Sequence, residues 1–142
     1  MVRLPQTLEL MKECLLKSPH DGSTLTLAVT RRSHGETDFD VIVETPMFTG
    51  RAEASTFHNG PPVAMFKTMA ECWRGWEGEE QWEDLEARVK FSATSDSTGH
   101  VKLRVDLRGH DSDSFMRVVV QFEAGQLESI AADVEGLFEA AA

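Results

Sequence analysis

Tryptophan and glutamate gather in one short stretch of the chain, which is the strongest candidate for a binding site. Tryptophan is enriched at the tightest contacts of protein interfaces, and flanking carboxylates complement a basic partner. The stretch therefore predicts a partner-binding surface made of Trp76, Glu77, Glu79, Glu80, Trp82 and Glu83. In the alternative reading, the two tryptophans cap the core where a helix meets a sheet, and the acids occupy an exposed turn and a helix N-terminus. Trp73, the third tryptophan, is expected in the core.

Histidine offers no recognisable metal or acid–base site in this sequence. The five histidines are scattered as His20, His34, His58, His100 and His110, and none forms a His-x-x-x-His or Glu-x-x-His pair on a helix. His100 and His110, with Asp111 and Asp113, make the one local cluster. Ten residues of an extended strand span roughly 30 Å, so the two histidines are expected at opposite ends of a strand. We predict no metal and no cofactor.

The sequence also lacks an activated nucleophile. No Gly-x-Ser-x-Gly elbow occurs, and no glycine-rich loop could cradle a phosphate. Cys72 lies within a helical pattern with Arg74 as its one basic neighbour, whereas reactive cysteines need an electropositive setting. Cys14 and Cys72 are therefore expected to be reduced structural thiols. We predict no catalytic residue, and a chain that is not an enzyme.

Charge restricts the class of partner. The 142 residues contain 24 acids and 14 bases, for a net charge of −10. Such a chain is a poor ligand for nucleic acid or an anionic membrane, and it favours a basic protein partner. The N-terminus shows no apolar segment of a signal peptide, so a cytoplasmic protein is expected. The length predicts a single domain over residues 1–142.

The second half of the chain has the clearest periodicity. Apolar residues alternate with polar ones over residues 85–93, 101–107 and 116–122, a pattern typical of half-buried strands. Short polar connections join them into a three-stranded antiparallel meander. Residues 127–138 then carry an apolar helical stripe, which is expected to pack on the apolar face of the meander.

The first half is less regular. Asn59-Gly60-Pro61-Pro62 begins a helix over residues 63–73, which Gly75 and Gly78 end. Strands are expected over residues 25–29, 39–43 and 48–54. Residues 8–16 fit a short helix or a strand; we favour a strand, since the turn at residues 20–22 would pair it with residues 25–29. The predicted fold is α+β, with one antiparallel sheet. In chain order, N-terminal strands come first, then a helix, then the three-stranded meander, and a C-terminal amphipathic helix packs on one face of the sheet.

Several segments together resemble a small bacterial family of unknown function. The likeness rests on Trp73–Gly78, Trp82, Leu85-Glu86, Asp96–Val101, Leu107-Arg108 and Gly125–Leu127. The family has no assigned activity, so the resemblance implies no catalytic residue. Small acidic proteins of this kind are also similar in composition to immunity proteins, which cover the active site of a toxin.

The sequence thus favours a non-catalytic, cytoplasmic protein-binding domain, with an immunity-type inhibitor of a basic partner or toxin as one form of it. The partner would be held by the acidic turn Glu77–Glu86 with Trp76 and Trp82, or by the acidic face of the C-terminal helix. The alternative is a small-molecule-binding protein or enzyme with a pocket between sheet and helix, and His58 or His100 at its mouth. A homodimer paired through strand edges is a third reading, so monomer and homodimer both stay open.

Overall fold

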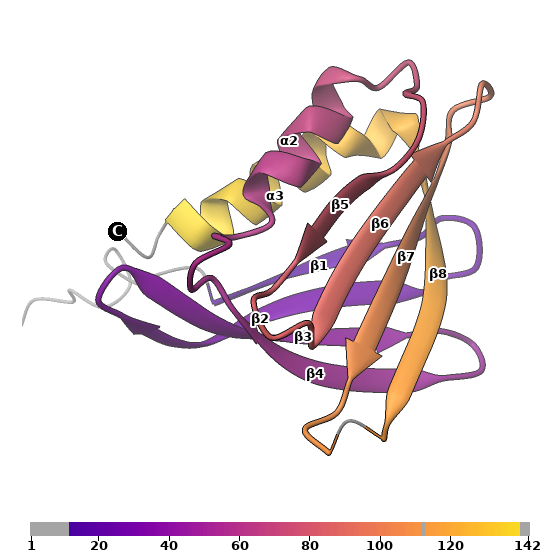
Figure 1. The fold of residues 1–142 in the computed structure, drawn as a ribbon. Coiled ribbons are helices and arrows are strands. Elements are labelled where there is room, and N and C mark those ends of the chain that lie inside the picture. Colours follow the sequence, from indigo (N-terminus) through magenta and orange to yellow (C-terminus); the bar gives the residue numbers. More distant parts are fainter. Residues whose placement is uncertain (1–11, 112, 140–142) are drawn as a thin grey trace, which may run out of the picture.

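The computed structural model describes residues 12–111 and 113–139, which form two four-stranded antiparallel sheets and two helices (Figure 1). Sheet A consists of β1 (Glu13–Lys17), β2 (Thr24–Ser33), β3 (Glu36–Glu44) and β4 (Thr49–Ser55). Sheet B consists of β5 (Glu80–Glu83), β6 (Val89–Ser95), β7 (His100–Arg108) and β8 (Phe115–Glu123). Helix α2 (Val63–Glu71) connects the sheets, and a 3-10 turn, η1 (Ala124–Gln126), leads into α3 (Leu127–Glu139).

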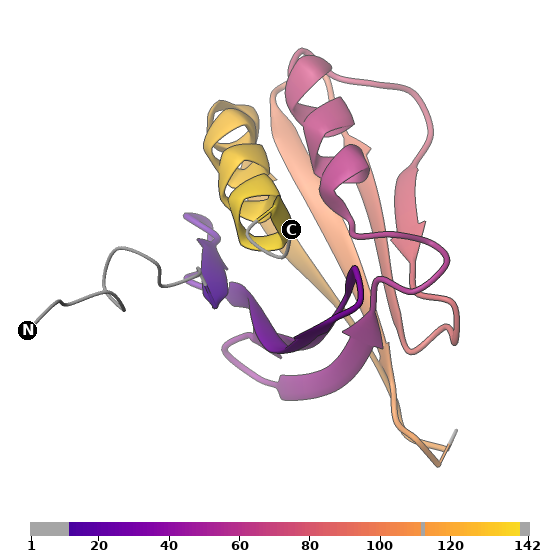
Figure 2. The same ribbon diagram turned by 90° about the vertical axis from the view of Figure 1, so that its left-hand side faces the viewer.

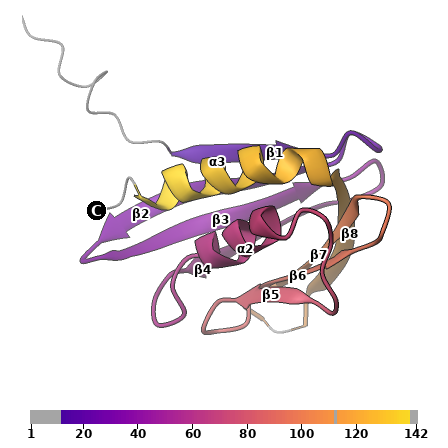
Figure 3. The same ribbon diagram turned by 90° about the horizontal axis from the view of Figure 1, so that it is seen from above.

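The two sheets meet at an angle, and the helices fill the space between them. Figure 2 shows sheet A beneath the helices and sheet B rising beside them. Seen from above, α2 and α3 lie side by side (Figure 3). The Nζ atom of Lys67 on α2 lies 3.0 Å from a carboxylate oxygen of Glu135 on α3. The inner faces of the two sheets are thereby covered by the helices, so a partner would contact other surfaces of the described chain: the outer faces, the sheet edges or the loops.

Alternating apolar residues create the buried face of each sheet. On sheet A, Leu25 and Leu27 face the helices, and on sheet B, Val101 and Leu103 do the same; all four are fully buried. Side chains alternate across a strand, so the residues between them point outward. The strands form in these places because each can bury one apolar row against α2 or α3.

An aromatic cluster occupies the centre of the core. The ring of Phe39 on β3 lies 4.9 Å from Phe138 on α3 and 5.9 Å from Trp82 on β5. Trp82 in turn lies 5.6 Å from Phe91 on β6, which contacts Phe66 on α2 at 6.1 Å. These centroid distances suit edge-to-face and tilted aromatic pairs. The cluster joins both sheets and both helices into one core.

The prediction of a single sheet with a three-stranded meander is wrong in its layout. The second sheet has a fourth strand, β5, within residues that the sequence assigned to an exposed turn. The strand predicted over residues 85–93 begins only at Val89, because Leu85 is exposed and Ala87 has a left-handed φ of 58°. Residues 84–88 instead turn the chain from β5 into β6. Apolar and polar residues alternate through this turn as they do in a strand, so the turn could not be recognised from the sequence.

Both helices are present, with corrections to their ends and packing. Helix α2 ends at Glu71, so Trp73 lies beyond it and is 53% exposed instead of buried. The apolar stripe of α3 is buried as predicted. The helix, however, packs beside α2 and on sheet A, where Phe138 meets Phe39 and the Leu137 carbonyl accepts a hydrogen bond from Arg32. Within the described residues, neither helix has the length and apolar character needed to cross a membrane.

The strand predicted at the N-terminus is confirmed over its described part. β1 pairs antiparallel with β2, with Leu16 opposite Leu25, around the turn that contains Gly22. Residues 8–11 of the predicted strand lie outside the described residues. The β2–β3 and β3–β4 pairings complete sheet A in the order β1-β2-β3-β4.

At Gly50, β4 of sheet A lies against β7 and β8 of sheet B, which gives a first prediction. A Cβ atom at this position would overlap the Met116 sulfur of β8 and lie 3.2 Å from Leu107 of β7. Gly50→Ala is expected to lower the free energy of unfolding by about 1 kcal/mol, because the flexible Met116 side chain must move aside and Leu107 must shift slightly. Gly125→Ala is the control, since nothing lies within 4 Å there. Equal denaturation midpoints for the two variants would contradict this packing.

Candidate functional site

The tryptophans of the predicted binding surface are placed differently from the expectation. Trp82 points into the core with 8% of its surface exposed, and its indole N–H donates to the Gly60 carbonyl at 3.0 Å. Trp76 is partly buried, and its N–H donates to the Ala93 carbonyl at 3.2 Å. Trp73 is instead the exposed one, with the Arg74 guanidinium 5.0 Å from its ring centre. Trp82 is therefore removed from the proposed contact surface.

The glutamates of that surface mostly stay exposed. β5 is an edge strand of sheet B. Side chains alternate across the strand, so Trp82 points inward while Glu83 points out. Glu77, Glu79 and Glu83 are exposed, and Glu80 is half-buried. Glu86 is also exposed, and we call the four exposed glutamates the acidic edge: Glu77, Glu79, Glu83 and Glu86. Two bases approach it loosely, Arg104 at 3.9 Å from Glu79 and Arg88 at 3.8 Å from Glu86.

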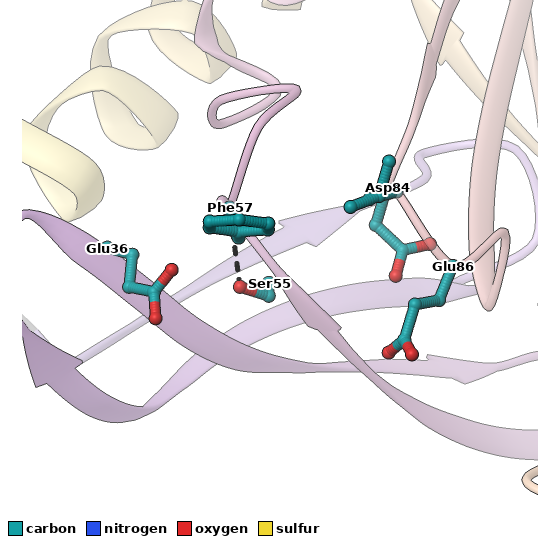
Figure 4. Close-up of a pocket in the computed structure, with 6 residues that line it drawn as sticks. Glu36, Ser55, Phe57, Asp84 and Glu86 are labelled. Carbon is teal, nitrogen blue, oxygen red and sulfur yellow. Dashed lines mark hydrogen bonds between the residues drawn. The ribbon is translucent and has the colours of Figure 1, made fainter.

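A pocket of about 400 Å³ lies at one end of the acidic edge, where the turn after β5 faces the end of β4. Figure 4 shows Glu36, Ser55 and Phe57 on one side, with Asp84 and Glu86 on the other. Phe57 and Leu85 contribute exposed apolar surface, at 56% and 49%. We call this the anionic pocket; it is lined by Glu36, Ser55, Phe57, Asp84, Leu85 and Glu86.

Asp84 is the unusual group of the pocket, because it is a carboxylate with only 4% of its surface exposed. Its Oδ1 accepts the backbone N–H groups of Arg88 at 2.8 Å and Val89 at 2.9 Å, which shapes the β5–β6 turn. Its Oδ2 has no hydrogen bond to any described residue. Burial raises the pKa of Asp84, and the nearby Glu86 charge adds to that increase. A cation in the pocket would relieve both effects.

Three residues with a strained backbone lie close in sequence to residues that line the anionic pocket. Among the described residues, positive φ angles at non-glycine positions occur at His34, His58 and Ala87, which lie close in sequence to Glu36, Phe57 and Glu86 respectively. Strained residues of this kind often cluster where a protein shapes a binding site.

Ala87 allows this strain to be measured. Its φ of 58° costs alanine about 1–2 kcal/mol, whereas glycine adopts it freely. Ala87→Gly should therefore raise the free energy of unfolding by about 0.5–1 kcal/mol after the entropy of the unfolded chain is included. Ala132→Gly on the exposed side of α3 should instead lower it by about 1 kcal/mol. Destabilisation by both substitutions in thermal or chemical unfolding would contradict the strained turn.

A second hollow, of about 420 Å³, lies at the other end of the acidic edge. It is lined by Arg74, Gly75, Trp76, Glu77, Ser95, Asp96 and Ser97. The carboxylate of Asp96 is occupied within its own loop, because Oδ1 accepts the backbone N–H groups of Thr98 and His100. These hydrogen bonds lower the pKa of Asp96. This carboxylate closes the β6–β7 hairpin and has little capacity left for a ligand.

The remaining titratable candidates do not assemble into a reactive site. No group of three or more histidine, cysteine or carboxylate side chains in the described part of the chain could hold a metal ion. His100 lies near Asp96 and Glu123, at 3.3 and 3.6 Å, while a ring nitrogen of His110 approaches Arg88 at 3.3 Å. Burial raises the pKa of Cys14 to about 12, so its thiolate is not accessible at neutral pH.

These features define a small α+β domain of two four-stranded antiparallel sheets and two helices, with an anionic pocket at the end of an acidic edge. The chain belongs to DUF6228, a family of unknown function, whose model matches residues 16–141. The expected membership of a family of unknown function is thereby confirmed. Neither the curated proteins nor the solved structures include a match to the chain.

Proposed function

We propose that this chain is a non-catalytic protein-binding domain that holds a basic partner along its acidic edge. The observation that carries the proposal is the row of exposed glutamates at residues 77, 79, 83 and 86, with a hollow at each end. Concave sites next to a charged surface are favourable for anchoring side chains of a partner. An immunity-type inhibitor, which covers the active site of a basic enzyme, is one form that this binding would take.

Electrostatics support a basic partner over other classes. The net charge of −10 raises the association rate with a positively charged surface. Among the described residues, Arg88 and Arg104 are the only bases within 4 Å of the acidic edge, and Gln81 donates a neutral hydrogen bond to Glu79 at 2.6 Å, so most of the negative charge is available to a partner. Because the glutamates are exposed, affinity should decrease as salt screens them.

Charge reversal with a matched control tests the proposal. The triple variant Glu77→Lys, Glu79→Lys, Glu83→Lys is compared with Glu128→Lys, Asp133→Lys, Glu139→Lys, which makes the same charge change on exposed α3 positions. Binding of a lysine–glycine repeat peptide is measured by isothermal titration calorimetry. We expect the first variant to lose at least about tenfold in affinity and the second much less. A larger loss in the α3 variant would move the contact surface to that helix.

The anionic pocket favours a second candidate, a protein that binds a small molecule. Its volume of about 400 Å³ is within the range of ligand sites, and it combines apolar walls with a few polar groups. The ligand would be a cation with an apolar part. A small cation that binds tightly without any peptide attached would favour this candidate.

A further inference from the structure

We infer that the anionic pocket receives the guanidinium group of an arginine side chain, an inference that rests on the proposed binding of a basic partner. The pocket places carboxylates on both sides of its opening, with Glu36 on one side and Asp84 and Glu86 on the other (Figure 4). Phe57 and Leu85 line the same pocket with exposed apolar surface. This arrangement suits a planar cation that has both charged edges and an apolar stem.

The apolar walls favour arginine over lysine. A guanidinium is planar and weakly hydrated, so it stacks on an aromatic ring and loses little when water is removed. The half-exposed ring of Phe57 offers a face for such stacking, and Leu85 can contact the methylene stem. An ammonium group is compact and strongly hydrated, and it gains less from either wall.

The carboxylates supply a geometry that a guanidinium can satisfy. Asp84 uses Oδ1 to hold the β5–β6 turn, which leaves Oδ2 without a partner among the described residues. The guanidinium group has five N–H donors in a rigid, planar arrangement, so it can donate hydrogen bonds to Asp84 and to a second carboxylate at the same time. A metal ion is a poor alternative, since the carboxylates of the described chain form no group of three that could hold one.

The probes are three blocked tripeptides with glycine on both sides of arginine, lysine or citrulline, the last being an uncharged analogue of arginine. Each is titrated into the full chain and followed by two-dimensional NMR. We expect the arginine peptide to bind about tenfold more tightly than the other two and to shift the amide signals of Phe57, Leu85 and Glu86. Equal binding by arginine and lysine, or shifts confined to another surface, would overturn the inference.

Two substitutions with matched controls make the test specific to the pocket. Asp84→Asn keeps an oxygen for the turn, yet should weaken arginine binding about tenfold, whereas Asp133→Asn on α3 should have no effect. Phe57→Leu should weaken it severalfold, and Phe48→Leu, at another exposed phenylalanine, should not. Unchanged binding in Asp84→Asn would overturn the inference.

The outcome separates the inference from the proposed function. If the lysine–glycine repeat peptide binds the acidic edge but the tripeptides show no preference, the inference is wrong and the proposed function stands. If neither the repeat peptide nor the tripeptides bind, both are wrong.

Discussion

Trp82→Ala is expected to lower the free energy of unfolding by about 3–5 kcal/mol. The substitution would leave a cavity between Phe39 and Phe91, whose rings contact Trp82. It would also leave the Gly60 carbonyl without its 3.0 Å hydrogen bond from the indole. Equilibrium unfolding in denaturant measures the loss.

Trp73→Ala is the matched control for this prediction. Trp73 is 53% exposed, so its removal should change the free energy of unfolding by only about 0.5 kcal/mol. A small effect at Trp82 together with a large effect at Trp73 would restore the placement that the sequence suggested and contradict the core described above.

Asp84→Asn is expected to stabilise the domain at neutral pH while weakening the proposed binding of an arginine side chain. Asparagine retains a side-chain oxygen that can accept the two backbone N–H groups of the β5–β6 turn. It removes a buried charge and its repulsion from Glu86, which together raise the pKa of Asp84. Sites built for binding often lose stability in this way. Asp84→Ala should lose about 1–3 kcal/mol instead, since the N–H groups are left unpaired.

The pH dependence follows from the sign of the pKa shift. The pKa of Asp84 is raised above its ordinary value of 3.8, so the unfolded chain releases this proton at a lower pH than the folded chain. The contribution of Asp84 to stability is therefore greatest below pH 3.8 and decreases as pH rises through its titration range. Unfolding curves of wild type and Asp84→Asn should converge in acid and separate toward neutral pH. Curves that separate as the pH falls would contradict the shift.

The sequence predicted those parts of the fold in which the hydrophobic periodicity is consistent with only one type of secondary structure. Apolar residues at every second position, such as Leu25 and Leu27 or Val101 and Leu103, identify strands because only one face of each strand is buried. The stripe of α3 is equally clear. The division into two sheets could not be predicted, because it depends on how β4 crosses sheet B near Gly50, a contact between residues far apart in the chain.

The candidate site was predicted in part. The acidic stretch was located from the sequence. Its exposed glutamates lie in the edge strand β5 and in the segments that flank it. The sequence left Trp82 open between a contact surface and the core, because a four-residue strand is too short for its alternation to be recognised, and the structure places Trp82 in the core. The anionic pocket could not be predicted from the sequence, since Glu36, Phe57 and Asp84 come from three distant segments. The one local signal was Phe57, a large apolar residue within the polar loop before Gly60.

The most direct test of the central claim is to map, by two-dimensional NMR of the wild-type chain, where a lysine–glycine repeat peptide binds. Binding along the acidic edge predicts amide shifts over residues 77–86, together with Phe57 at the pocket, and their disappearance at high salt. Shifts confined to the acidic side of α3, or no shifts at low salt, would contradict the account.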